Sequence, residues 1–304
     1  MNDATFSVGL VQAACQANVD TNRANADRGI RTAAARGAQI ICLQELFASE
    51  YFCQVEDTNR FGLAETVPGP STEQGAALAK ELGVVLVVPV FERRAPGLYH
   101  NSAVVIDATG NLLGVYRKMH IPDDPQYFEK FYFTPGDLGY QVFATSFANV
   151  GVLICWDQWF PEASRLTALK GADVIFYPSA IGWLRDDRET TGQSQSDAWR
   201  TIQRGHAIAN GVYVAVVNRV GHEGDPAGGL HFWGQSFICD PMGQVLSAGS
   251  DTGVDVLVAT CSRDVLETQR RSWPFLRDRR IESYSGLTER YLDSSTSASI
   301  DTTE

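Results

Sequence analysis

Three side chains that could do acyl-transfer chemistry stand at the ends of apolar runs of the sequence. Glu45 closes the run AQIICLQE, Lys118 closes LLGVYRK, and Cys155 closes VGVLIC. A charged group at the end of a buried strand is costly unless it is paired or functional. A thiol nucleophile, a carboxylate base and a cation that stabilises an oxyanion are together what acyl transfer requires.

Each of these residues also has an ordinary structural explanation. An isolated cysteine is more often a packed core residue than a nucleophile. Glu45 could be a helix-capping or surface carboxylate, and Lys118 could be a solvated residue at a strand end. Glu129 lies in the aromatic segment FEKFYF, where desolvation would raise its pKa, but it could instead pair with Lys130 or Arg117. The catalytic interpretation therefore depends on the four residues as a group.

A repeated order of elements predicts that these residues meet. Four helical stretches each end at a glycine and are followed by an apolar strand; they cover residues 21–36, 72–82, 161–170 and 197–210. Glycine fits the left-handed residue that ends a helix. Continuous apolar runs indicate strands covered on both faces. Because ligand sites in α/β sheets gather at the carboxyl ends of strands, we expect Glu45, Lys118 and Cys155 to converge.

The region around Cys155 adds a second expectation. The strand that ends at this residue passes into a helix near Pro161, so the thiol is expected at a strand-to-helix turn. Backbone N–H groups in such a turn can face a developing oxyanion, and a nearby helix N-terminus favours a thiolate.

Two hairpins complete the predicted architecture. Residues 101–107 and 112–118 flank the turn ATG, and residues 235–240 and 244–248 flank PMG. Turn residues between short strand-like runs indicate antiparallel neighbours. Mixed strand directions with covering helices predict a layered α/β fold. We expect one domain over residues 1–291 and a disordered polar tail over residues 292–304.

Composition excludes several classes of protein. Of the 304 residues 44% are hydrophobic and 20% charged, and the net charge of -11 argues against a nucleic-acid binder, which would carry a basic face. No apolar run reaches about 18 residues, so no membrane span is expected. The six cysteines form no CxxC pair, which together with the absence of a secretory signal favours a reducing, cytoplasmic location. The five histidines show no HxxxH or HxH spacing, so no metal site is expected.

The segments LQELF, YRKMHIP and ICWDQWFPE resemble the Glu-Lys-Cys signature of the nitrilase superfamily, and the similarity runs from about Phe6 to Tyr284. The resemblance implies a four-layer αββα sandwich that forms a homodimer or higher homo-oligomer, without metal or organic cofactor. It also implies roles for individual residues: Cys155 as nucleophile, Glu45 as general base, Lys118 as oxyanion cation, Glu129 as a second glutamate, and the backbone N–H of Trp156 as a further oxyanion donor.

Within the superfamily, the segments ASEYFCQ, YPSAIGW and RSWPFLRDRR most resemble the N-carbamoylputrescine amidases. That branch implies a carbamoyl amine substrate and a place in polyamine biosynthesis. The substrate ammonium needs a carboxylate or an aromatic partner, for which the candidates are Trp183, Asp186, Asp187, Glu189 and Asp197.

Two other interpretations stay open. A β-ureido acid, an N-carbamoyl amino acid, a simple amide or a nitrile could be the substrate, and an acid would want an arginine such as Arg185 or Arg188. The fold could also serve as a catalytically silent scaffold, although a scaffold has no need to retain all three residues of the Glu-Lys-Cys signature.

Overall fold

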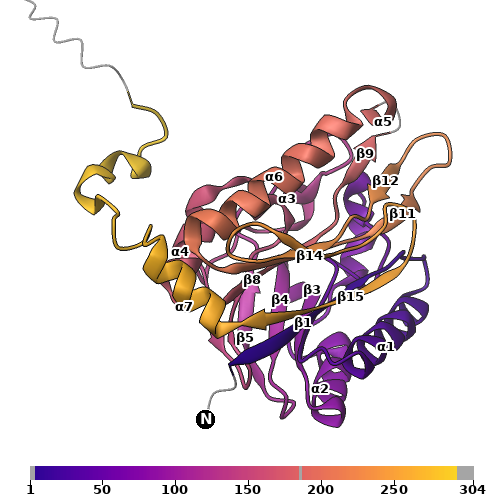
Figure 1. Cartoon of the computed structure of the whole chain (residues 1–304). Coiled ribbons are helices and arrows are strands. Elements are labelled where there is room, and N and C mark those ends of the chain that lie inside the picture. Colours follow the sequence, from indigo (N-terminus) through magenta and orange to yellow (C-terminus); the bar gives the residue numbers. More distant parts are fainter. Residues whose placement is uncertain (1–3, 185–186, 293–304) are drawn as a thin grey trace, which may run out of the picture.

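The computed structural model describes residues 4–184 and 187–292, and two six-stranded mixed sheets form its centre (Figure 1). The first sheet has, in spatial order, β15 (Asp255–Ser262), β1 (Thr5–Gln12), β2 (Ile40–Leu43), β3 (Val85–Ala95), β4 (Leu98–Ile106) and β5 (Leu112–Arg117). The second has β14 (Val245–Ala248), β13 (Phe237–Cys239), β10 (Tyr213–Asn218), β8 (Val174–Ser179), β7 (Asn149–Val152) and β6 (Val142–Ala144). A small third sheet joins β11 (Val220–Glu223), β12 (Leu230–Trp233) and β9 (Gly182–Leu184).

Helices cover the outer face of each large sheet. Helices α1 (Val19–Ala35) and α2 (Pro70–Leu82) pack on the first sheet, and α4 (Pro161–Leu169) and α6 (Gly192–Asn210) pack on the second. Figure 1 shows the two pairs of helices on opposite sides of the paired sheets. The predicted four-layer αββα architecture is therefore confirmed.

Alternation along the buried strands explains their continuous apolar runs. In β2, Ile40 and Cys42 belong to the apolar cluster that contains residues of both sheets, whereas Ile41 and Leu43 pack under α1 and α2. Successive side chains of a strand point to opposite faces, so a strand with helices on one side and a second sheet on the other is apolar at every position.

The glycines after the predicted helices lie in left-handed backbone conformations. The helix α2 ends at Gly83 with φ 67°, and α6 ends at Gly211 with φ 60°. These are conformations that glycine adopts at little steric cost. The helix α6 begins at Gly192, earlier than the predicted start at 197, and the Gln195 N–H donates to the Thr191 carbonyl at 3.0 Å in its first turn. The indole N–H of Trp183 also donates to the Gly192 carbonyl.

Strand directions bring the predicted residues to one edge. Strand β3 is parallel to β2, and β4 and β5 each reverse direction, so β2 and β5 run the same way. Lys118 directly follows β5 and Glu45 lies two residues after β2, at the same edge of the first sheet. Cys155 follows β7 of the second sheet and opens the 3₁₀ helix η3 (Cys155–Trp159), which leads into α4.

The C-terminal part continues beyond the sandwich. The helix α7 (Arg263–Ser272) follows β15 and is succeeded by the short 3₁₀ helices η4 (Ile281–Ser283) and η5 (Ser285–Thr288), which Figure 1 draws apart from the main body. Residues 293–304, most of the predicted tail, lie outside the described residues. Within residues 4–184 and 187–292, no helix has the length and apolar character that crossing a membrane requires.

Candidate active site

Glu45, Lys118 and Glu129 form a buried charged cluster at the edge where β2 and β5 end. The Lys118 ammonium donates to Oε1 of Glu45 at 2.8 Å and to Oε2 of Glu129 at 2.7 Å. The side chain of Glu129, which opens the short helix α3 (Glu129–Tyr132), is 1% exposed, and those of Glu45 and Lys118 are fully buried. The cluster carries one positive and up to two negative charges in a dry setting, which is where electrostatic interactions are strongest.

Glu45 has one occupied and one free oxygen. Its Oε1 also accepts a hydrogen bond from the Asn101 amide at 2.7 Å. Its Oε2 is buried and has no hydrogen-bond partner among the described residues. A buried carboxylate oxygen without a donor is available to accept a proton from a neighbouring group.

The turn at Cys155 is held in an unusual backbone conformation. Cys155 is buried and has φ 43°, in the left-handed region that residues with a side chain rarely adopt. Asp157 supports the turn, because its Oδ2 accepts the Ile154 N–H at 2.9 Å and the Tyr116 hydroxyl at 2.6 Å. Its Oδ1 accepts the backbone N–H and ring Nδ1 of His120, so one carboxylate ties the cysteine turn to the segment that follows Lys118.

Burial and the neighbouring charges set the protonation states of the site. Burial raises the pKa of the Cys155 thiol well above its ordinary value; Glu45 raises it further and Lys118 lowers it. Burial lowers the pKa of Lys118, but Glu129 and Glu45 outweigh burial and hold this pKa well above its ordinary value. Burial also raises the pKa of Glu129 to about 7. These directions favour a neutral thiol beside an ammonium, so the thiol would need a base in order to act as a nucleophile.

Cys155 and Glu129 line a cavity of about 370 Å³, a size typical of small-molecule sites. Trp156 and Trp159 contribute aromatic wall, and Asp124 and Asp187 contribute carboxylates. The described lining contains no lysine and no arginine. Within the described ranges there is also no group of three or more His, Cys, Asp or Glu residues placed to hold a metal ion. The arrangement can bind a small, mostly apolar molecule with a cationic end against a nucleophile.

The model of the family described as "Carbon-nitrogen hydrolase" matches residues 7–271. The chain belongs to this family. This chain is 46% identical to an N-carbamoylputrescine amidase of Solanum lycopersicum, over 92% of its length and 94% of that protein. It is 40% identical to a citrullinase of Francisella tularensis, over 95% of this chain and all of that protein. A solved carbon-nitrogen hydrolase of Helicobacter pylori superposes with a TM-score of 0.91 at 45% identity and covers 95% of this chain and all of its own.

Only some of the predicted amine-binding residues lie at the cavity. Asp187, in α5 (Asp187–Thr190), lines the cavity. Trp183 is buried against Trp233 and is not among the lining residues, although Gly182 and Leu184 on either side are. Glu189 and Asp197 are exposed and are not among the described residues that line the cavity. Asp186 lies outside the described residues.

Three residues of the candidate site were not predicted from the sequence. Asn101 donates to Glu45, the Tyr51 hydroxyl donates to Oε1 of Glu129 at 2.7 Å, and Asp124 lines the cavity. Asn101 had a usable signal, since it is a polar residue in a buried strand that the hairpin pattern places beside Lys118. Tyr51 and Asp124 lie in loops whose sequences do not indicate which way a side chain points.

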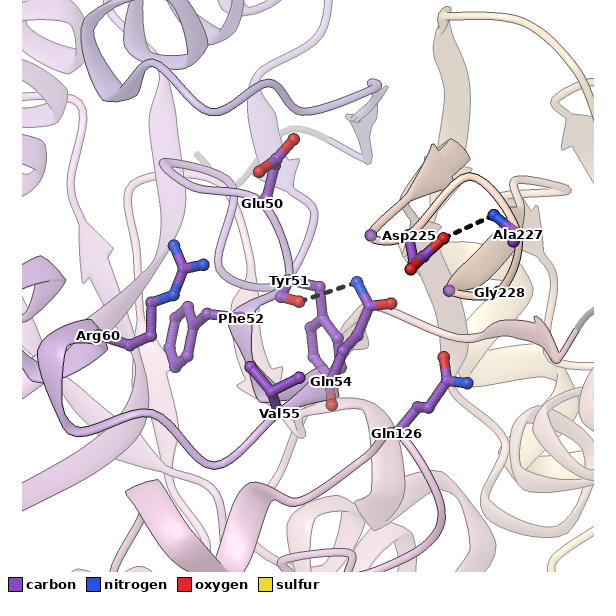
Figure 2. A pocket seen from close by; sticks show the side chains of 12 residues that line it. Glu50, Tyr51, Phe52, Gln54, Val55, Arg60, Gln126, Asp225, Ala227 and Gly228 are labelled. Atoms are coloured by element: carbon purple, nitrogen blue, oxygen red, sulfur yellow. Dashed lines mark hydrogen bonds between the residues drawn. The ribbon is translucent and has the colours of Figure 1, made fainter.

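A larger cavity, of about 520 Å³, involves the same tyrosine but has no nucleophile among its described lining residues. Figure 2 shows Gln54, Gln126 and Asp225 around this second cavity, with Tyr51 and Glu50 nearby. Cys155 and Glu129 line the smaller cavity, so the candidate site is not at the larger one.

Proposed function

We propose that the protein hydrolyses N-carbamoylputrescine to putrescine, ammonia and carbon dioxide through an acyl-enzyme on Cys155, as a step of polyamine biosynthesis. The carbamoyl group is common to this molecule and to citrulline, the substrate named by the citrullinase relative. The two molecules differ at the far end, where citrulline has a carboxylate beside its amine. The choice between them therefore depends on the charges that line the cavity away from Cys155.

The acidic lining of the cavity is the observation that carries the proposal. Asp124 and Asp187 provide carboxylates for an ammonium, and no cation in the described lining would receive a carboxylate. An unpaired carboxylate in a partly enclosed site is unfavourable, so this lining favours the amine over the amino acid. Arg185 and the side chain of Arg188 lie outside what the structure describes, and the substrate comparison below includes acids for that reason.

In the acylation step, Oε2 of Glu45 takes the Cys155 proton and the thiolate attacks the carbamoyl carbon. The oxyanion is stabilised by the Lys118 ammonium and by the backbone N–H of Trp156. The protonated Glu45 gives its proton to the departing ammonia, which leaves a carbamoyl thioester on Cys155. The free oxygen of Glu45 and the neutral resting thiol support this order of events.

In the hydrolysis step, Glu45 takes a proton from water, which attacks the thioester, and Glu129 orients the groups around it. The protonated Glu45 returns this proton to the Cys155 sulfur, which leaves as the thiol, and the product carbamate loses carbon dioxide to free the amine. Glu129 is suited to an orienting role because Lys118 and the Tyr51 hydroxyl hold one oxygen each.

The test is ammonia release from N-carbamoylputrescine, citrulline and N-carbamoyl-β-alanine, with the Cys155→Ala protein as the blank. We expect kcat/KM for N-carbamoylputrescine to exceed that of either acid by at least about tenfold, since each unpaired charge in the site costs on the order of 1.4 kcal/mol or more. Equal or faster turnover of citrulline would reject the substrate assignment. No turnover of any substrate, together with a Cys155 that iodoacetamide does not label, would indicate a silent scaffold.

The amine partner is tested separately. Asp187→Asn and Asp124→Asn should each raise KM for N-carbamoylputrescine by about 10-fold with a smaller change in kcat, because the far end of the substrate is remote from the reacting bond. Asp123→Asn is the matched control, since Asp123 is an exposed neighbour that does not line the cavity. If neither cavity variant changes KM, these carboxylates do not meet the amine.

We also infer a single domain over residues 1–291, a homodimer or higher homo-oligomer, and a cytoplasmic location. The pairing of the C-terminal strand β15 with β1 supports the single domain. Exposed apolar side chains on the C-terminal segment, among them Trp273 and Ile281, support subunit contacts. All six cysteines are free and buried, which supports a reducing compartment. Light scattering coupled to gel filtration measures the oligomeric state directly.

A further inference from the structure

Arg219 is a buried cation that the Glu-Lys-Cys signature does not include. It lies between β10 and β11, its side chain is 0% exposed, and its Nη1 pairs with both Glu223 oxygens, at 2.9 Å and 3.0 Å. A buried ion pair is weak evidence for stability, because desolvation offsets much of its attraction. The pair also contacts two segments that carry residues of the candidate site.

The first set of contacts is to the backbone that carries Glu45. The Arg219 Nη2 donates to the carbonyls of Glu45 and Leu46, each at 2.9 Å, and Nη1 donates to the carbonyl of Ser49 at 2.9 Å. Leu46 has φ 51°, a left-handed conformation that a branched residue adopts only when its surroundings impose it. The segment has no helical or strand hydrogen bonding of its own beyond a turn, so the guanidinium supplies much of what fixes it.

The second set of contacts leads to Glu129. Oε2 of Glu223 accepts the backbone N–H of Tyr51 at 2.6 Å, and the hydroxyl of the same tyrosine donates to Glu129. The Tyr51 ring packs edge-on against Phe232, and the Arg219 guanidinium lies over both rings. The Arg219–Glu223 pair therefore binds Glu45 directly, at the Glu45 backbone carbonyl. It is linked to Glu129 through one residue, Tyr51.

We propose that Arg219 and Glu223 are positioning residues that hold Glu45 and Glu129 in register with Cys155, an inference that rests on the proposed function. A guanidinium suits this task because its planar fork can meet three carbonyls and a carboxylate at once, whereas a lysine ammonium has only three donors on a flexible stem. Neither Arg219 nor Glu223 is among the described residues that line the cavity containing Cys155. Its effect is expected on the chemical steps and not on substrate binding.

The test compares Arg219→Lys and Glu223→Gln with Glu65→Gln. The control is matched because Glu65 is also a largely buried carboxylate that accepts an arginine and a backbone N–H, from Arg23 and Ser71, but it contacts no residue of the site. For each protein we would measure thermal unfolding, kcat and KM for N-carbamoylputrescine, and the rate at which iodoacetamide alkylates Cys155.

If the pair positions the glutamates, kcat should fall about 10- to 100-fold in both pair variants, the range expected for a displacement of about 1 Å. KM should stay within about threefold of the wild-type value, and alkylation should slow together with kcat. The control should lose stability without losing kcat. Pair variants that are folded at the assay temperature but keep kcat and alkylation within about twofold of wild type would overturn the proposal.

The Tyr51→Phe variant and the alkylation rate distinguish the remaining outcomes. Tyr51→Phe removes only the hydroxyl on Glu129, so it tests that arm even if an ion-pair variant does not fold; an unchanged kcat there would overturn the connection to Glu129. Alkylation needs no physiological substrate. A wild-type protein that turns over no carbamoyl substrate, yet shows slowed alkylation in the pair variants, would reject the substrate assignment and retain the positioning role.

Discussion

Replacing Lys118 with methionine removes a buried ammonium while keeping an unbranched side chain of similar length. In the wild-type protein this ammonium lies 2.8 Å from Glu45 and 2.7 Å from Glu129, and none of its side chain is exposed. The variant leaves two buried carboxyl groups facing a thioether. Their hydrogen bonds to Asn101 and Tyr51 remain, but their counter-ion is lost.

Two magnitudes follow from this geometry. Loss of one oxyanion donor costs roughly 100- to 1000-fold in rate, or about 2.7–4 kcal/mol of transition-state stabilisation. Breaking a buried ion pair costs about 3–5 kcal/mol of stability. In the wild-type protein the ammonium lowers the pKa of Glu129, which burial raises. Without the ammonium this pKa rises further, so the folded variant binds more protons than the unfolded chain. Its free energy of unfolding should therefore fall as pH rises from about 4.3 through the folded pKa, more steeply than in wild type.

The assay has a kinetic and a thermodynamic part. Ammonia release gives kcat, and urea unfolding at about pH 5 and about pH 8 gives the free energy of unfolding on both sides of the expected titration. Lys130→Met is the matched control, because Lys130 is the exposed neighbour of Glu129 on α3. It loses the same charge from the surface and should keep both kcat and the wild-type pH dependence of stability.

The reasoning would be refuted if Lys118→Met kept kcat within about tenfold of wild type, because no oxyanion cation would then be needed. It would also be refuted if the stability of the variant showed no greater pH dependence than that of the control. The second result would mean that the Lys118 ammonium does not lower the pKa of Glu129.

Asn101→Ala should lower kcat about 10-fold, because Oε1 of Glu45 loses a charge-assisted hydrogen bond of about 1.5 kcal/mol. An unchanged kcat in steady-state kinetics on the folded variant would contradict this. The raised pKa of Glu129, about 7, predicts that kcat/KM falls as pH drops through that value, since the ionised form holds Lys118. Glu129→Gln should lack this acidic limb, and a limb that persists in its pH–rate profile would assign it to another group. The raised pKa also means that Glu129 contributes stability below its unfolded pKa that is lost as pH rises toward 7, so the Gln variant should show a flatter dependence of unfolding free energy on pH. Gly136→Ala should destabilise the protein by at least about 2 kcal/mol, because an added Cβ would lie 2.1 Å from the Arg117 carbonyl oxygen, and a thermal-unfolding midpoint equal to wild type would show that the backbone there can yield.

Much of the architecture could be predicted because its causes are local. The glycines that end α2 and α6 and the continuous apolar run of β2 each depend on a few adjacent residues. The turn between β4 and β5 indicated an antiparallel pair, and the structure has that pair in register from Ser102 with Arg117. Strands β2 and β5 run in the same direction, so residues just after them lie at the same edge of the sheet. This explains why Glu45 and Lys118 meet.

The remaining parts of the site depend on contacts that local patterns do not encode. Asn101 and Glu45 are 56 residues apart, Tyr51 and Glu129 are 78 apart, and Arg219 donates to the Glu45 carbonyl across 174 residues. Trp183 illustrates the same limit, because an indole can serve a binding cavity or the core, and only its hydrogen bond to Gly192 and its packing on Trp233 decide.

The positive φ of Cys155 limits how this chain can evolve. Among the twenty residues, only glycine takes a φ of 43° without steric cost, and glycine carries no sulfur. A substitution of Cys155 by glycine, which would relieve the strain at this position, therefore removes the thiol. Substitutions that raise the stability of the protein while keeping the thiol therefore have to occur at other positions.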